Sequence, residues 1–198
     1  MIRRLALALA LAAAARAADL PVPPSSNPEA LRWYTQLKMH YLPKESGFLS
    51  IIAASEQLTE VHGKRIPVQG QVFYMLTSEL PANYLHWLES DDTQILIEGG
   101  PVDYYVFHPD GSAEKFTMGR DVEHGQVLVI PVHGGCYKAL RLHPGASYVL
   151  LANCLSPEWT PDRVRIGEGR DFISRYQGKA PWATEAFLRE LIGTNWKP

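Results

Sequence analysis

The sequence predicts an all-β domain, a sandwich or a barrel, with a helix at each end. Between about residues 48 and 166 the chain divides into nine or so short β-rich runs, and turn signals separate them. Glycine and proline, at 15 residues each, favour many tight turns over a helical bundle. With 198 residues, 46% of them hydrophobic, the chain is long enough to bury one core.

The chain begins like an exported protein. Residues 1–4 form a short basic start, and residues 5–15 form an apolar run that is too short to span a bilayer. The small-x-small step Ala15-Arg16-Ala17 fits cleavage after residue 17. We therefore expect a signal peptide over 1–17, a Pro-rich leader over 18–27 and a single domain over 28–198, in a secreted or periplasmic protein. An uncleaved membrane anchor is the alternative; after cleavage we expect no contact with a membrane.

The first helix is predicted over about Pro28 to His40. Ser26-Asn27-Pro28-Glu29 provides a capping side chain, a proline in the first turn and an acid at the positive end of the dipole. Leu31, Tyr34 and Leu37 recur at helical spacing. One face of this helix should therefore pack on the body of the protein.

The β-rich runs and the last helix follow. The strands are predicted over about residues 48–54, 68–77, 84–88, 94–98, 102–108, 114–118, 127–132, 136–142 and 148–155. Turns rich in glycine and proline at 99–101, 109–111 and 143–145 separate several of these strands. A last helix over about 182–192 carries an apolar stripe and is followed by Gly193 as a stop.

The two cysteines, Cys136 and Cys154, flank the turn at 143–146. A hairpin folded about that turn sets opposite each other residues whose numbers sum to roughly 290, and this pair satisfies the sum. Exported proteins meet an oxidising compartment. We expect a disulfide here, in competition with two buried free thiols that act as small hydrophobes.

Charge argues against a nucleic-acid partner. The formal net charge is −2, and the 19 Lys and Arg residues are scattered among 21 Asp and Glu residues. The sequence also lacks a glycine-rich phosphate loop and a Gly-x-Ser-x-Gly nucleophile elbow. The partner that remains is a small-molecule ligand.

Two segments carry spaced residues that match a known pair of motifs. In the first motif His86 occupies the first histidine place, Leu88 the second, Asp92 the acid place and Gly99 the glycine place. In the second motif Gly125 and Pro131 match, and Cys136 stands where the last histidine would be. In these positions the chain resembles the cupins. The resemblance implies an all-β, double-stranded β-helix, the jelly-roll cupin barrel, with flanking N- and C-terminal helices.

A more specific resemblance is to a cupin branch catalogued as a domain of unknown function. Its ordered motifs match the following segments of this chain: Glu45-Ser46-Gly47-Phe48, residues 72–76, His86 with Ser90-Asp91-Asp92, Pro109-Asp110-Gly111, Val129-Ile130-Pro131 and residues 153–159. Together they cover about residues 28 to 167. Members of this branch resemble one another in pairing through their sheets, which implies a homodimer.

The candidate site follows from the barrel. Alternate residues of a strand point inward, so His86 and Leu88 share a face. Cupin metal sites use about three imidazoles and a carboxylate, whereas this chain offers only His86, Asp92 and either His133 or Cys136. We therefore expect no cofactor, and a divalent metal is disfavoured. The ligand-binding candidates are Glu45, Tyr74, Tyr84, Gln94 and Tyr137.

The function predicted from these residues is binding of a small molecule, sugar-like or another cyclic metabolite, inside the barrel. The alternative is an isomerase, epimerase or cyclase in which His86 and Asp92 act as acid–base groups, because a carboxylate beside an imidazole raises its basicity. A metal-dependent oxygenase is a weaker alternative. A secreted storage or scaffold protein without a ligand is the structural alternative.

Overall fold

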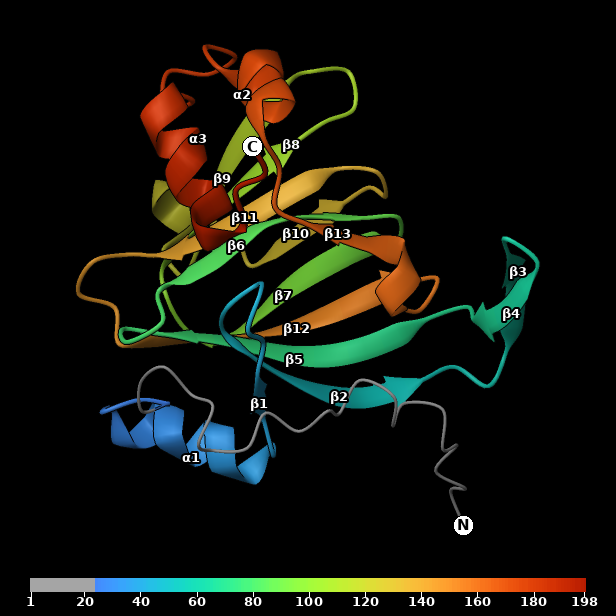
Figure 1. Ribbon diagram of the computed structural model, residues 1–198. Coiled ribbons are helices and arrows are strands. Elements are labelled where there is room, and N and C mark those ends of the chain that lie inside the picture. Colours follow the sequence, from blue (N-terminus) through green and yellow to red (C-terminus); the bar gives the residue numbers. More distant parts are fainter. Residues whose placement is uncertain (1–23) are drawn as a thin grey trace.

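The computed structural model describes residues 24–198, and the predicted signal peptide over 1–17 lies outside them. The all-β prediction is confirmed: two antiparallel sheets face each other, with helices outside (Figure 1). Within residues 24–198, no helix has the length and apolar character that a membrane crossing requires.

Two sheets form the barrel. The large sheet has six strands, in the spatial order β1 (His40–Tyr41), β2 (Phe48–Ala54), β5 (Gly70–Thr77), β12 (Tyr148–Ser156), β7 (Asp91–Gly99) and β10 (Val129–Val132). The small sheet has five, in the order β13 (Val164–Ile166), β6 (Ala82–Leu88), β11 (Tyr137–Leu142), β8 (Val102–Phe107) and β9 (Ala113–Met118). A separate hairpin of β3 (Leu58–Val61) and β4 (Lys64–Pro67) extends to one side (Figure 1).

One part of the barrel interior is filled with apolar side chains from both sheets. Leu76 and Leu151 of the large sheet meet Tyr104, Val106 and Leu140 of the small sheet, and all five are buried. They point inward because alternate residues of a strand face the same side. The interior that this core leaves unfilled is the pocket described below.

Helices cover the outer faces of the two sheets. Helix α1 (Pro28–Gln36) lies outside the large sheet, where Ala30 packs near Phe48 and Met75. Its start follows the prediction, because the Asn27 side chain accepts hydrogen bonds from the amides of Glu29 and Ala30. It ends four residues earlier than predicted, and His40 opens β1 instead.

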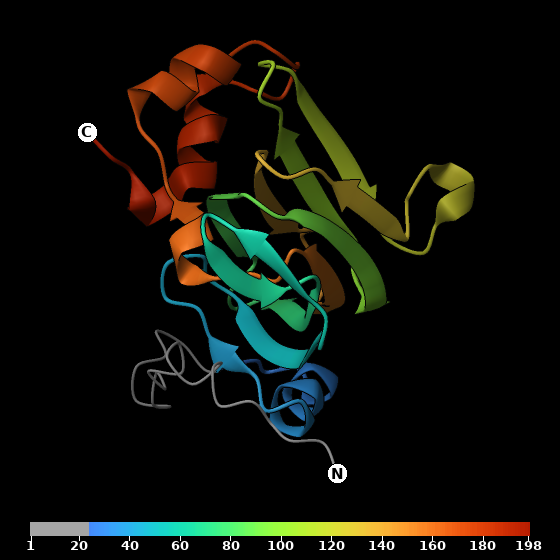
Figure 2. The ribbon, with the colours of Figure 1, turned by 90° about the vertical axis from the view of Figure 1, so that its right-hand side faces the viewer.

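The C-terminal helices cover the small sheet (Figure 2). Helix α3 (Glu185–Ile192) matches the predicted last helix, although it begins three residues later at the Thr184 cap, whose hydroxyl accepts from the Phe187 amide. Helix α2 (Arg170–Tyr176) was not predicted. Together the two helices bury the apolar outer face of β6, β8 and β11.

The hairpin predicted about residues 143–146 is wrong, and so is the disulfide derived from it. Strands β11 and β12 follow each other in sequence but lie in different sheets: β11 pairs with β6 and β8, and β12 pairs with β5 and β7. The turn therefore carries the chain across the barrel. Cys136 and Cys154 are free thiols; Cys136 is buried and Cys154 is partly buried. The alternative of free thiols is the one observed.

Candidate functional site

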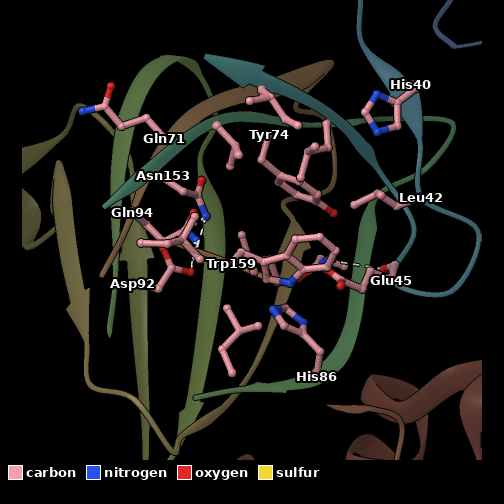
Figure 3. Close-up of a pocket in the computed structure, with 18 of the residues that line it drawn as sticks. His40, Leu42, Glu45, Gln71, Tyr74, His86, Asp92, Gln94, Asn153 and Trp159 are labelled. Carbon is pink, nitrogen blue, oxygen red and sulfur yellow. Dashed lines mark hydrogen bonds between the residues drawn. The ribbon is translucent and has the colours of Figure 1, made fainter. Parts of the chain in front are cut away.

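A cavity of about 270 Å³ opens into the barrel between the two sheets. Its walls come from β1, β2, β5, β6, β7, β11 and β12, together with the segment that runs from β1 to β2 and with Glu158 and Trp159. Four predicted site residues besides His86 line it: Glu45, Tyr74, Asp92 and Gln94 (Figure 3). Tyr84 and Tyr137 do not.

A β-bulge in β6 decides which side chains of that strand enter the cavity. On β11, Lys138 pairs with His86, but Leu140 pairs with Asn83, so β6 carries one extra residue between these pairs. As a result, Asn83, His86 and Leu88 line the cavity. Strict alternation from His86 would have placed Tyr84 inside. The expectation that Tyr84 binds the ligand is corrected, because its ring packs on the outer side of the sheet against Gly193.

His86 is held in one orientation and one tautomer. Its ring is 5% exposed, and Nδ1 lies 2.9 Å from the Tyr84 carbonyl oxygen. Because a carbonyl only accepts, Nδ1 carries the hydrogen, and Nε2 keeps its lone pair. Burial lowers the pKa of His86, although the Glu45 charge opposes this. At neutral pH the cavity therefore contains a neutral imidazole with a free acceptor nitrogen.

Asp92 is the centre of a buried polar cluster, formed with Lys138, Gln94 and Asn153. Its carboxylate is 2% exposed and forms an ion pair with the equally buried Lys138 ammonium. It also accepts from Gln94 Nε2 at 2.9 Å and from Asn153 Nδ2 at 3.3 and 3.4 Å. Since a carboxylate only accepts, both amides must turn their NH₂ groups toward it and their oxygens away.

His86 and Asp92 share the cavity without touching. In residues 24–198 no hydrogen bond joins them, and Figure 3 shows Asp92 beside Gln94 and Asn153, apart from His86 and Glu45. The charge of Asp92 is balanced by Lys138 rather than by the imidazole. Glu45 is the carboxylate whose charge acts most on His86.

The loop that carries Glu45 rests on Tyr74. The Tyr74 hydroxyl donates to the Ser46 carbonyl at 2.7 Å, and the Glu45 carbonyl accepts from the Tyr84 amide at 2.7 Å. Gly47 has φ +80°, and a Cβ there would lie 2.2 Å from the Tyr74 hydroxyl oxygen, so only glycine fits. Burial raises the pKa of Tyr74 well above its ordinary value, so the hydroxyl keeps its proton.

Tyr137 lies on the outer face of β11, because its neighbour Lys138 points inward. The hydroxyl of Tyr137 donates to Glu168 Oε1 at 2.6 Å, and its ring packs edge-to-face on Phe172. The expectation that Tyr137 binds the ligand is thus corrected. Tyr137 instead joins the small sheet to the C-terminal segment.

The most important polar residue that sequence reasoning missed is Lys138. It stands inside the apolar run 136–142, at an inward position, and a lysine is almost never fully buried without a partner. That signal was available and indicates a buried acid nearby. Asn83 was not predictable in the same way, because only the bulge brings it inside.

Comparison with known proteins assigns the family. The family model described as Cupin superfamily (DUF985) matches residues 32–166, more than half of the chain. The chain belongs to the cupin superfamily. The cupin resemblance of the two motifs is therefore confirmed, as is the resemblance to the branch of unknown function.

Similar proteins span nearly the same length as this cupin. The chain is 26% identical to the uncharacterized protein YML079W of Saccharomyces cerevisiae over 186 residues, which is 85% of this chain and 89% of that protein. A hypothetical protein from Leishmania major superimposes with a TM-score of 0.69 at 22% identity, covering 82% of this chain and 97% of the other. A Shewanella oneidensis protein gives 0.65 at 17%, covering 84% and 96%. These two structures support the fold.

The donor set at the cupin metal positions does not fit a metal ion. Leu88 offers no ligand, Cys136 is buried with Sγ 3.5 Å from His108 Nδ1, and Asp92 already has the Lys138 ammonium as its counter-charge. No group of three or more His, Cys, Asp or Glu side chains in residues 24–198 is arranged to hold an ion.

We expect the buried His86 to make the stability of the protein fall as the pH is lowered. Because burial lowers its pKa, the unfolded chain takes up a proton at a higher pH than the folded protein does. Above the ordinary histidine pKa of about 6.5 both states are neutral; below it the unfolded state is favoured and stability is lost. We expect His86→Gln to lose less free energy of unfolding than the parent as the pH falls from about 6.5 to about 5 in urea titrations.

Two controls isolate the His86 contribution. His40, whose pKa burial also lowers, is present in both proteins, so its effect cancels in the comparison. His133→Gln removes a histidine whose side chain is 90% exposed, and this variant should keep the slope of the parent. Identical slopes for His86→Gln and the parent would contradict the prediction.

Proposed function

We propose that this cupin binds a small cyclic molecule in its barrel. The observation that carries the proposal is the cavity of about 270 Å³ in which apolar walls surround a few polar groups fixed in orientation. Such a lining is typical of ligand pockets, which commonly measure about 300–1,000 Å³. The volume favours a ligand of about one ring, such as a monosaccharide or another cyclic metabolite.

A variant whose cavity is filled by a larger side chain tests this proposal. Leu88 is buried in the lining, so Leu88→Trp should occupy the space that the ligand needs. We expect ligand-observed NMR of the full chain with a library of monosaccharides and small ring compounds to find binders that Leu88→Trp abolishes. Leu58→Trp adds the same ring at an exposed position of β3 outside the lining and should bind like the parent. A library in which no binder is sensitive to Leu88→Trp would contradict the proposal.

An acid–base isomerase or epimerase is the second candidate. It is favoured by the neutral imidazole of His86, whose Nε2 lone pair is free to accept a proton. Glu45 is better suited than Asp92 to act as the second acid–base group, since the Asp92 carboxylate already has Lys138, Gln94 and Asn153 as partners. An isomerase of this kind exchanges a C–H hydrogen of its substrate with solvent, so binders would be incubated in D₂O. Exchange that His86→Gln abolishes would support catalysis, and a binder that never exchanges would favour binding alone.

We also propose that the protein is exported after cleavage behind residue 17 and assembles as a homodimer. The basic start and apolar run of residues 1–15 support export. The homodimer is supported by two exposed apolar side chains, Val129 on the edge strand β10 and Leu128 beside it, which a second copy of the chain would cover. The mass of the mature chain and sedimentation in solution test the two statements separately.

A further inference from the structure

The charges that face the cavity are negative. Its lining contains three carboxylates, Glu45, Asp92 and Glu158, and neither a lysine nor an arginine. The histidines of the lining, His40 and His86, do not compensate, because burial lowers the pKa of both. Lys138, behind the lining, balances only Asp92. Two carboxylates of the lining therefore have no cationic partner in the part of the chain that the structure describes.

Four polar side chains of the lining donate hydrogen bonds to other groups of the protein and not into the cavity. His86 donates Nδ1–H to the Tyr84 carbonyl, and Tyr74 donates its hydroxyl to the Ser46 carbonyl. Gln94 and Asn153 turn their NH₂ groups to Asp92, and their oxygens, which have no hydrogen-bond partner, are themselves fully buried. The accessible acceptor among these four side chains is therefore Nε2 of His86.

Nε2 of His86 is the acceptor that points to a ligand most directly. The residue is 95% buried, and Nε2 has no hydrogen-bond partner among residues 24–198. The Glu45 carboxylate lies close enough for its charge to raise the pKa of both His86 and Tyr74. An imidazole lone pair and a carboxylate that line the same cavity can both accept hydrogen bonds from one group with two or more N–H donors, and a positive charge on that group strengthens both bonds.

Resting on the small-molecule site proposed above, we propose that the ligand is an organic amine, bound as its ammonium ion. The ammonium group donates to Nε2 of His86 and to the Glu45 carboxylate, and the apolar body of the ligand packs against Leu42, Leu49 and the Trp159 ring. The lining also holds neutral donors, which are the Tyr41 hydroxyl, the His40 ring N–H, the Trp159 indole N–H and the side-chain amides of Gln71 and Asn83, but none of them supplies a positive charge. A carboxylate ligand of the same size would meet Glu45 and Glu158 without a cationic side chain to receive it.

Three probes of matched shape test the sign of the ligand charge: benzylamine, benzyl alcohol and benzoate. We expect isothermal titration of the full chain at pH 7.5 to give an affinity for benzylamine at least about tenfold above that for benzoate, with benzyl alcohol between them. Glu45→Gln should weaken benzylamine at least about tenfold and leave benzyl alcohol almost unchanged. Glu123→Gln, which changes the net charge equally at an exposed residue outside the lining, should alter neither.

The remaining outcomes separate this inference from the proposed function. If benzoate or benzyl alcohol binds more tightly than benzylamine, and Leu88→Trp removes that binding, the amine inference fails and the small-molecule site stands. If benzylamine binds but neither Glu45→Gln nor Leu88→Trp weakens it, the amine lies elsewhere and the inference fails. If none of the three probes binds at millimolar concentration, the inference fails, and the library screen above decides the small-molecule site independently.

Discussion

Lys138→Met is expected to destabilise the protein by about 3–5 kcal/mol, because it leaves the Asp92 carboxylate buried without a counter-charge. Both side chains are 2% exposed, so water cannot replace the lost partner. The two amides on Asp92 would remain, but neither carries a charge. The free energy of unfolding in urea measures the loss.

Two comparisons show whether burial is the cause. The double variant Asp92→Asn/Lys138→Met removes both charges and should lose less than the two single variants together, since neither partner is left charged alone. Lys64→Met breaks an ion pair with Asp162 whose side chains are 66% and 54% exposed, and it should cost at most about 1 kcal/mol. A Lys138→Met loss as small as that of Lys64→Met would contradict the prediction, because the buried ion pair would then contribute no more than an exposed one.

Much of the barrel could be predicted from the sequence because its longer strands are apolar runs of seven to nine residues bounded by turn signals. The predicted run 48–54 coincides with β2, and the run 148–155 differs from β12 by one residue. The short elements were missed for a physical reason. Strand β1 has two residues and β13 has three, which is too few for a period of two to show, and β13 also depends on pairing with the distant strand β6.

Strand pairing was the part of the fold that local patterns could not give. The turn at 143–146 has the chemistry of a hairpin, yet its two strands go to opposite sheets. From β5 to β8 and from β9 to β13 consecutive strands lie in opposite sheets, whereas β8 and β9 form a hairpin, so a turn signal fixes where a strand ends but not which strand it joins. The predicted Cys136–Cys154 pairing failed at this step.

The candidate site was also predicted only in part: its polar residues were found, but their partners were not. His86 and Asp92 were placed in one cavity by alternation and by the motif spacing. Their partners were not predictable from spacing, because Lys138 reaches Asp92 from a strand 46 residues away and Tyr84 reaches His86 through a bulge. The sequence thus indicates the polar residues of the site, and only the packing decides that Asp92 orients amides while His86 faces the cavity.

Phe107→Ala is expected to cost about 3–5 kcal/mol of stability by leaving a cavity between the small sheet and the C-terminal helices. Phe107 is fully buried, and its ring centroid lies 5.0 Å from that of Phe172, 5.1 Å from Tyr176 and 5.7 Å from Trp182. Two of these neighbours lie on α2, and Trp182 lies in the segment between α2 and α3. Urea unfolding, followed by far-UV circular dichroism, measures the loss.

Phe187→Ala is the matched control, since Phe187 belongs to the edge of the same aromatic cluster but is only partly buried, and its loss should be smaller. Because Phe107 faces the helices and not the barrel cavity, benzylamine binding by the folded Phe107→Ala protein should equal that of the parent. Equal, small losses for both variants would mean that the helices can separate from the small sheet at little cost.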